Sequence, residues 1–236
     1  MSSNWSRWRC RDVTEPAPTT VPVGESLKAR NDRQARANRD AFRARGLVVL
    51  NLLSSPGSGK TALLERTLSE YGRRRRVGVV VGDLQTDNDA RRLAGRGGPV
   101  VPVTTGTVCH LKADMVARAV AGLDLAALDV LVIENVGNLV CPASFDLGED
   151  TRVVLLSTTE GEDKPLKYPR AFKTAHAVVL TKTDLAGPAG FDRAAALANV
   201  RAVNPDATVL ELSARTGEGL GEWYAYLDGL VARRAG

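Results

Sequence analysis

Seven short apolar runs, spaced through the chain from residue 47 onward, constrain its fold more than any other feature. Each run is a continuous stretch of mainly Val, Ile and Leu between turn residues, which is typical of strands buried on both faces of a sheet. Helical patterns such as "KTALLERTLSEY", "LKADMVARAVAGL" and "DRAAALANVRAV" lie between most of them. We therefore predict an α/β fold, in which helices flank a mostly parallel central sheet. The runs are "LVVLNLL", "VGVVVG", "PVVPVTT", "DVLVIE", "RVVLLST", "AVVLTK" and "TVLELS".

The chain divides into three parts, and its length of 236 residues suits one well-packed α/β domain. Residues 1–24 are rich in Pro, Thr and Ser without periodicity, so we expect a flexible tail. Cys10, which falls in this tail, offers too few ligands for a metal site by itself. Residues 25–46 contain many helix formers and end on Gly46, a natural helix terminator. Residues 47–236 should form the domain that carries the chemistry.

The composition indicates a cytoplasmic protein with no membrane partner. Hydrophobic residues make up 44% and charged residues 25% of the chain, and the longest apolar run is far too short to span a bilayer. The first residues are basic but no apolar core follows them, so they do not resemble a secretion signal. Three cysteines are too few to suggest a disulfide framework.

Basic charge raises the question of a nucleic-acid partner. The net charge is +5, and four consecutive arginines occupy residues 73–76. These arginines fall between a helical pattern and a strand, where a solvated turn is expected, and no aromatic residues interleave with them to stack on bases. We therefore interpret the run as a surface turn and expect no nucleic-acid partner.

The segment "SSPGSGKT" follows the first predicted strand and precedes a helix, which is the context of a nucleotide phosphate-binding loop. Its glycines let backbone N–H groups face the phosphates, while Lys60 reaches the β- and γ-phosphates and Thr61 can ligate Mg²⁺. Ser54 replaces the first glycine of the pattern. The predicted nucleotide-binding residues of this loop are Ser55, Pro56, Gly57, Ser58, Gly59, Lys60 and Thr61.

Acidic residues end the second and fourth predicted strands, close to the expected phosphates. Asp83 could ligate Mg²⁺ or orient the attacking water, although an aspartate that only forms a turn remains an alternative. Glu134 would face the Mg²⁺ water shell, and Gly137 would give the γ-phosphate a backbone N–H. The candidate catalytic residues are thus Lys60, Asp83 and Glu134, and the candidate magnesium ligands are Thr61, Asp83 and Glu134.

Two further segments predict that the base is guanine. In "TKTD", Asp184 can accept two hydrogen bonds from guanine that adenine cannot offer in that arrangement, and the Lys182 stem would cover the base. Thr181 stands where GTPases usually have asparagine. In "SARTGEG", Ser213 and Ala214 would bring a backbone N–H to the guanine oxygen. In this order and at these distances from the phosphate loop, the segments indicate a GTPase with GTP and GDP as ligands.

The segments "NRDAFRARGLVVLNLLSSPGSGKT", "GDLQTDNDA", "GTVCHLKADM", "IENVGNLVCPASFDLGED" and "TTEGEDKPLKYP" closely resemble the HypB family over nearly all of residues 21–236. Members of this family are GTPases with a P-loop fold of the SIMIBI type that assist nickel insertion into [NiFe]-hydrogenase. The related UreG family carries a Cys-Pro-His motif, which this sequence lacks.

The resemblance implies Ni²⁺ or Zn²⁺ binding, a homodimer formed on GTP or metal binding, and slow hydrolysis. It also implies a hydrogenase accessory protein of the HypA type and the hydrogenase large subunit as partners. Many family members carry an N-terminal Cys-x-x-Cys-Gly-Cys motif or a histidine-rich segment. This sequence has neither, so a nickel-storage role is not expected.

Cys109 and His110 are adjacent and precede a helical apolar stripe, so they should lie at or just before a helix N-terminus, where thiol pKa values fall. Cys141, four residues after Gly137, would add a second sulfur, and such ligands suit Zn²⁺ or Ni²⁺. The residues alone leave open that both cysteines are buried small hydrophobes and that the histidine is a helix N-terminal donor. The resemblance favours a metal site. We interpret His176, at the start of an apolar strand, as structural.

Three functions are compatible with these features. The first is a metal-regulated GTPase that delivers nickel, either to hydrogenase or in the related urease accessory role. The second is a non-enzymatic nickel- or zinc-binding protein whose dimerisation is controlled by nucleotide. The third is a P-loop protein associated with nucleic acid. Slow hydrolysis is expected of the first, because no arginine in the sequence stands out as a cis arginine finger.

Overall fold

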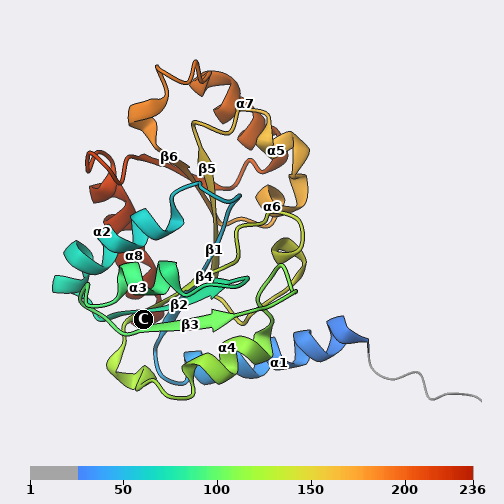
Figure 1. The fold of residues 1–236 in the computed structure, drawn as a ribbon, viewed down its shortest axis with the longest axis vertical. Helices are drawn as coiled ribbons and strands as arrows, with labels where there is room; N and C mark the ends of the chain where they lie inside the picture. The colour runs from blue at the N-terminus through green and yellow to red at the C-terminus, as the bar shows by residue number, and fades with distance from the viewer. Residues whose placement is uncertain (1–25, 236) are drawn as a thin grey trace, which may run out of the picture.

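A computed structural model describes residues 26–235, so the predictions made for the tail and for Cys10 lie outside the described residues. The seven apolar runs form one sheet in the order β3-β2-β4-β1-β5-β6-β7, in which every neighbouring pair is parallel. The predicted α/β class is confirmed (Figure 1). The strands are β1 (Val48–Leu53), β2 (Val77–Asp83), β3 (Val100–Thr104), β4 (Val130–Glu134), β5 (Thr151–Ser157), β6 (Ala177–Thr181) and β7 (Thr208–Leu212).

The predicted helices are present, and the described residues contain four α-helices that were not predicted. The N-terminal helix begins after Ser26, whose hydroxyl accepts a 3.1 Å hydrogen bond from the N–H of Ala29, and a turn with Gly46 at φ 66° follows it. Among the described residues, no helix is both long and apolar enough to cross a membrane. The helices are α1 (Leu27–Arg43), α2 (Lys60–Glu70), α3 (Asn88–Leu93), α4 (Ala113–Val120), α5 (Lys164–Lys167), α6 (Pro169–Lys173), α7 (Arg193–Val203) and α8 (Leu220–Ala235).

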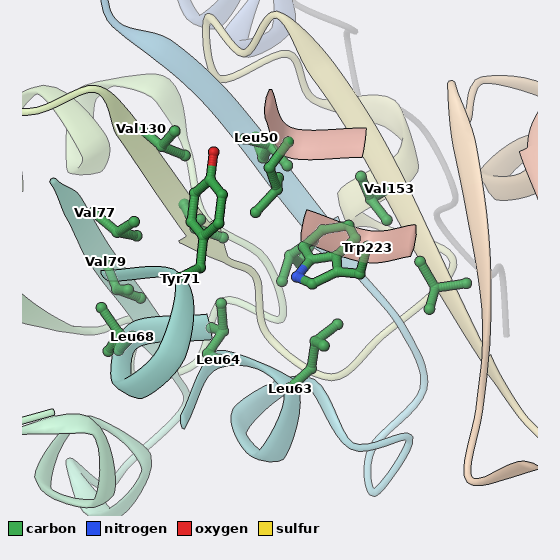
Figure 2. Packing of buried hydrophobic residues seen from close by; sticks show 14 of the residues in the cluster. Leu50, Leu63, Leu64, Leu68, Tyr71, Val77, Val79, Val130, Val153 and Trp223 are labelled. Carbon is green, nitrogen blue, oxygen red and sulfur yellow. The ribbon is translucent and has the colours of Figure 1, made fainter. Parts of the chain in front are cut away.

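Helices cover both faces of the sheet, because alternate residues of each central strand point to opposite sides. On one face, α2 and α8 pack on β1, β4 and β5, and Trp223 and Leu64 lie between helix and sheet (Figure 2). The indole N–H of Trp223 donates a 3.0 Å hydrogen bond to the hydroxyl of Thr67. On the opposite face, α1 and α4 cover β1, β2 and β4, while α6 and α7 cover β5 and β6.

The arginine run lies after α2 and has acidic partners. Arg74 and Arg75 form ion pairs with Asp228 of α8, and Arg76 forms one with Asp129. The guanidinium of Arg74 also lies over two tyrosine rings, 5.0 Å and 5.9 Å from their centroids. The run is therefore an exposed surface turn, as the sequence predicts, although carboxylates and rings distant in the chain contact three of its four arginines.

Candidate functional site

The phosphate loop predicted from the sequence is the turn between β1 and α2. Gly57 and Gly59 have φ values of 75° and 95°, which glycine adopts without strain. Gly59 is also the residue that caps the N-terminus of α2. Backbone N–H groups and a helix N-terminus therefore meet in this loop, and both favour an anion.

Ser54, the residue that replaces the first glycine of the pattern, is a partner of Lys60, the lysine predicted to bind phosphate. Its buried hydroxyl accepts a 2.7 Å hydrogen bond from Lys60 Nζ and donates one of 2.6 Å to the carbonyl of Ser55. Burial lowers the pKa of Lys60, while Glu134 and other nearby carboxylates act in the opposite sense. The substitution thus holds the ammonium group inside the loop, where a phosphate would compete with Ser54 for it.

Thr61 and Glu134 meet at the start of α2. The Thr61 hydroxyl donates a 2.8 Å hydrogen bond to Glu134 Oε1, whereas Glu134 Oε2 is buried with no hydrogen-bond partner among the described residues. Burial raises the pKa of Glu134 to about 7, against the lowering effects of Lys60 and Thr61. A hydroxyl beside an unpartnered carboxylate oxygen suits Mg²⁺, so these two residues fit the predicted ion.

Asp83 ends β2 and stabilises the turn that follows it. Its Oδ1 accepts hydrogen bonds of 2.9 Å from the backbone N–H groups two and three residues later, which is the alternative that the sequence left open. Burial acts to raise the pKa of Asp83, but these hydrogen bonds outweigh it and the pKa lies below its usual value. Its charge nevertheless acts on Lys60.

Asp89 of α3 is a further acid near the site that the sequence analysis did not single out. Its charge acts on both Lys60 and Glu134, so it lies near the expected phosphate and magnesium positions. The sequence does show a further acid six residues after Asp83, in the segment "GDLQTDNDA", and this acid could have been named as a candidate.

Gly137 lies directly against the phosphate loop. A Cβ atom built at this glycine would lie 3.0 Å from Pro56 Cα and 3.1 Å from Pro56 N, so a side chain there would push the two segments apart. The loop after β4 therefore packs on the loop after β1, as a segment that senses the γ-phosphate requires. Cys141 follows on the same segment.

Asp184, which the sequence predicts to bind guanine, is held by two residues of the loop after β7. Ser213 donates a hydrogen bond to Oδ1, and Arg215 Nε donates a 2.8 Å hydrogen bond to Oδ2. These two donors, Ser213 above all, keep the pKa of Asp184 below its usual value. The carboxylate is thus ionised and oriented, as acceptance of two hydrogen bonds from guanine requires. The sequence analysis did not single out Arg215, although it directly follows Ser213 and Ala214.

The other two residues predicted to surround the base also lie beside the phosphate loop or α2. Lys182 has a left-handed backbone at φ 58°, and its Cε would lie 4.0 Å from a Cβ built at Gly59. The carbonyl of Ala214 accepts a 2.8 Å hydrogen bond from Arg66 of α2. The loops after β6 and β7 are therefore fixed relative to the phosphate loop.

Cys109, His110 and Cys141 come together, as predicted. Their ligand atoms all lie within 4.8 Å of one another, and within the described residues they form the one such group with metal-ligand spacing. His110 is buried, and neither of its ring nitrogens has a hydrogen-bond partner among the described residues. Two orphaned nitrogens beside two thiols fit a metal ion. His176 has the structural role expected of it, because its Nδ1 accepts a 2.9 Å hydrogen bond from the N–H of Arg152.

The predicted metal ligands lie in loops, and the Cys141 thiol is protonated when no ion is bound. Because α4 begins at Ala113, Cys109 and His110 lie in the loop that precedes it. The hydrogen bond to Cys109, and burial to a lesser degree, raise the pKa of the Cys141 thiol. Burial also lowers the pKa of His110. Binding of a metal ion would therefore release protons, since the ion requires thiolates and neutral imidazole.

Phe145 orients the histidine and was missed by the sequence analysis. Its ring is stacked on His110, with the ring centroids 4.0 Å apart and the planes 24° from parallel. The stacking holds the imidazole in one plane although neither nitrogen is hydrogen-bonded. An aromatic residue four positions after Cys141 was the only signal in the sequence.

Two buried asparagines of α1 connect the two halves of the predicted metal site. Asn31 accepts a 2.9 Å hydrogen bond from the N–H of Ala113 and donates one of 2.8 Å to the carbonyl of Asp146. Asn38 donates to the carbonyls of Ala113, at 2.8 Å, and Leu147, at 3.0 Å. Each side chain thus joins the segment after His110 to the segment after Cys141. We call this pair the α1 bracket.

The sequence also matches characterised proteins. Residues 48–211 match the family described as CobW/HypB/UreG, nucleotide-binding domain. The hydrogenase maturation factor HypB of Azotobacter vinelandii is 54% identical over 206 residues, which cover 87% of this chain and 68% of that protein. The hydrogenase/urease maturation factor HypB of Helicobacter hepaticus is 46% identical over 176 residues, which cover 73% of this chain and 72% of that protein.

Solved structures agree with these sequence matches. HypB from Helicobacter pylori, solved in complex with nickel, superposes with a TM-score of 0.83 at 39% identity, covering 86% of this chain and 96% of that one. FtsY from Mycoplasma mycoides superposes with a TM-score of 0.55 at 13% identity, covering 88% of this chain and 79% of that one. The second likeness concerns the fold alone, which is the predicted SIMIBI type.

Proposed function

Because the chain belongs to the CobW/HypB/UreG family and, within it, to the HypB hydrogenase maturation factors, we propose that it is a GTPase that binds nickel and assists its insertion into [NiFe]-hydrogenase. One observation carries this proposal. The segment that packs on the phosphate loop at Gly137 continues directly to the metal-site residue Cys141. Nucleotide and metal can therefore influence each other through a single stretch of chain.

The nucleotide part of the proposal is supported by the loops around the phosphate and base positions. Lys60 binds the β- and γ-phosphates, and Thr61 and Glu134 hold Mg²⁺, which neutralises charge on the phosphates when bound. Asp83 remains a candidate to orient the attacking water, in addition to its place in the turn. The ionised carboxylate of Asp184 selects guanine over adenine.

In this proposal the protein carries nickel, and the ligands of the ion are Cys109, His110 and Cys141. Three protein ligands leave at least one coordination position open, which a carrier needs in order to pass its ion on. The same donors also suit Zn²⁺. Phe145 and the α1 bracket keep the three ligands in place while the ion is absent.

The remaining parts of the proposal concern partners. The protein is cytoplasmic, dimerises on GTP or metal binding, and acts with an accessory protein of the HypA type and with the hydrogenase large subunit. Val140, next to Cys141, supports a protein contact at the metal site, because this apolar residue is 60% exposed. A partner that covers it would also reach the open coordination position.

Two measurements test the proposed function. The first is steady-state phosphate release from GTP with Mg²⁺, for which we expect a slow but measurable rate that ATP does not support. The second is the nickel and zinc content of the protein with and without a non-hydrolysable GTP analogue, compared with a Cys109→Ser variant. Bound metal that persists in that variant would contradict the assigned ligands. No phosphate release above that of a Lys60→Ala control would favour the non-enzymatic alternative.

Urease is a second candidate recipient of the metal. The name of the Helicobacter hepaticus relative includes both hydrogenase and urease maturation. Nickel transfer to the apo forms of both enzymes, measured with the same loaded protein, distinguishes the two. We expect activation of apo-hydrogenase, and activation of apo-urease alone would contradict the proposal.

A further inference from the structure

Asn135 lies between the nucleotide and metal sites and is almost completely buried, with 1% of its surface exposed. It directly follows Glu134. Its backbone N–H donates a 3.1 Å hydrogen bond to the carbonyl of Leu52, and its Nδ2 donates one of 3.2 Å to Oδ1 of Asn51. Both partners belong to β1, so the position and direction of the side chain are set from the centre of the sheet.

The side-chain oxygen of Asn135 is shared by two segments. Oδ1 accepts a 3.0 Å hydrogen bond from the N–H of Val136, in the segment that leads to Gly137. The same atom accepts a 3.1 Å hydrogen bond from the N–H of Leu111, the residue after His110. Thus one oxygen joins the backbone beside the phosphate loop to the backbone beside the metal ligands.

The bond to Leu111 is difficult to replace. Leu111 is fully buried, and its side chain lies so close to Gly82 of β2 that a Cβ atom there would be 2.7 Å from Leu111 Cγ. A buried N–H that loses its acceptor destabilises the fold, so the loop that holds His110 has to keep its register with Asn135. Movement of Asn135 will therefore move this loop.

We propose that Asn135 is the positioning residue through which the nucleotide state changes nickel affinity. When the segment at Val136 and Gly137 moves toward the γ-phosphate, the shared oxygen has to follow it or lose a bond. If the oxygen follows, it draws the Leu111 amide with it, and if the bond to Leu111 breaks, this amide loses its acceptor. Both changes reposition Cys109 and His110 relative to Cys141. This inference rests on the proposed GTPase and nickel-carrier function and names the contact that links the two sites.

The α1 bracket provides a matched control. Asn38 also hydrogen-bonds a residue close to His110, namely Ala113, but its other backbone partner is Leu147, ten residues after Gly137 and beyond Cys141, and it makes no bond to Val136 or Gly137 among those of the described residues. Both asparagines are buried, and each has a side-chain atom that bonds to two backbone groups. Loss of Asn38 should therefore loosen the metal site in every nucleotide state, whereas loss of Asn135 should remove the dependence on nucleotide.

The experiment is a nickel titration of the full chain loaded with GDP or with a non-hydrolysable GTP analogue, for the unmodified protein, Asn135→Ala and Asn38→Ala. In the unmodified protein we expect the two nickel dissociation constants to differ by about 5- to 150-fold, the usual range for coupled sites. In Asn135→Ala we expect this ratio to fall to within about twofold of one. In Asn38→Ala both constants should rise while their ratio is kept.

The possible outcomes separate this inference from the function on which it rests. Equal nickel constants in the two states of the unmodified protein would contradict the coupling assumed in the proposed function. A ratio kept in Asn135→Ala, or lost to the same degree in Asn38→Ala, would overturn the role of Asn135 alone. The reciprocal measurement, the preference for the analogue over GDP with and without nickel, should change by the same factor.

A second measurement does not depend on any variant being folded. Amide hydrogen exchange of nickel-free, unmodified protein should show different protection of the Leu111 N–H in the GDP and analogue states. If Asn135 transmits the nucleotide state, the acceptor of this amide is disturbed in one of them. Identical protection in the two states would overturn the inference.

Discussion

The hydroxyl of Thr181, at the end of β6, donates a 2.7 Å hydrogen bond to the backbone carbonyl of Ser58 in the phosphate loop. Both residues are buried. Thr181 stands where GTPases usually have asparagine. Its hydroxyl nevertheless connects the loop predicted to bind the base with the loop predicted to bind the phosphates. A threonine at this position therefore keeps the two loops in contact.

Thr181→Val should weaken binding of GTP and GDP alike. Valine has the shape of threonine but leaves the carbonyl of Ser58 without this donor, which costs about 1–3 kcal/mol and corresponds to a loss of roughly 5- to 150-fold in affinity. Thr181→Asn is the control, because its amide can donate to the same carbonyl. Nucleotide titration by calorimetry measures both variants, and unchanged affinity in Thr181→Val would show that the contact is dispensable.

Asp184→Asn should reduce GTP affinity and favour a xanthine nucleotide. The amide places a donor where the carboxylate accepts from guanine, and mispaired polar groups cost about 1–3 kcal/mol each. Competition between GTP and xanthosine triphosphate measures the preference. Arg215→Ala is the control, since it removes a partner of Asp184 but keeps the carboxylate and should therefore retain the guanine preference. An Asp184→Asn variant with full GTP affinity would mean that another loop reads the base.

Glu134→Gln should stabilise the nucleotide-free protein at pH 8 but not at pH 4. The folded pKa of Glu134 is about 7, whereas the unfolded value is about 4.3. At a pH between these two values, Glu134 keeps its proton in the folded state but has lost it in the unfolded state, so the free energy of unfolding falls as the pH rises. The stabilisation is fully present below the unfolded pKa and is lost as the pH rises through the folded pKa.

Above pH 7 the buried carboxylate costs on the order of 3 kcal/mol, and glutamine removes this cost. Urea unfolding at intervals between pH 4 and pH 8 measures the difference between Glu134→Gln and the unmodified protein. A difference that stays constant over this range would contradict the raised pKa.

Lys60→Ala should abolish GTP hydrolysis and leave nickel binding by the nucleotide-free protein intact. The lysine bonds to Ser54 inside the phosphate loop and takes no part in the group of Cys109, His110 and Cys141. Phosphate release and nickel titration of one folded preparation measure the two activities. Loss of both together would mean that the sites cannot be separated as proposed.

Phe145→Leu should weaken nickel binding less than His110→Ala does. Leucine fills the space but cannot stack on the imidazole, so the ring is free to rotate before it meets the ion. We expect a loss of about tenfold, within the range seen when groups that orient a metal ligand are removed. Competition with a chelator measures the affinity, and nickel binding as tight as that of the unmodified protein would show that stacking does not position His110.

Local sequence was sufficient for the strands and the phosphate loop. A continuous apolar run can be buried only between two layers, and the glycines of the segment from Ser54 to Thr61 are needed wherever backbone N–H groups face an anion. These properties depend on neighbours in the chain. The same holds for the N-terminal helix, which begins at a serine cap and is followed by a glycine turn.

Four helices could not be predicted in this way. α3, α5 and α6 are no longer than six residues, and helices of that length are not stable without the packing around them. α8 contains two glycines and several aromatic residues, so its intrinsic helix propensity is low. The burial of Trp223 between α8 and the sheet stabilises it instead.

The connection between the sites was decided by the tertiary structure. In the sheet β4 lies between β1 and β2, and this order brings Glu134 to Thr61 and Asn135 to Asn51. The sequence predicts which residues stand at strand ends, because side-chain type and spacing are local. It does not predict that one oxygen of Asn135 binds Leu111, because the contacts of a buried polar group are set by segments that are distant in the chain and packed around it.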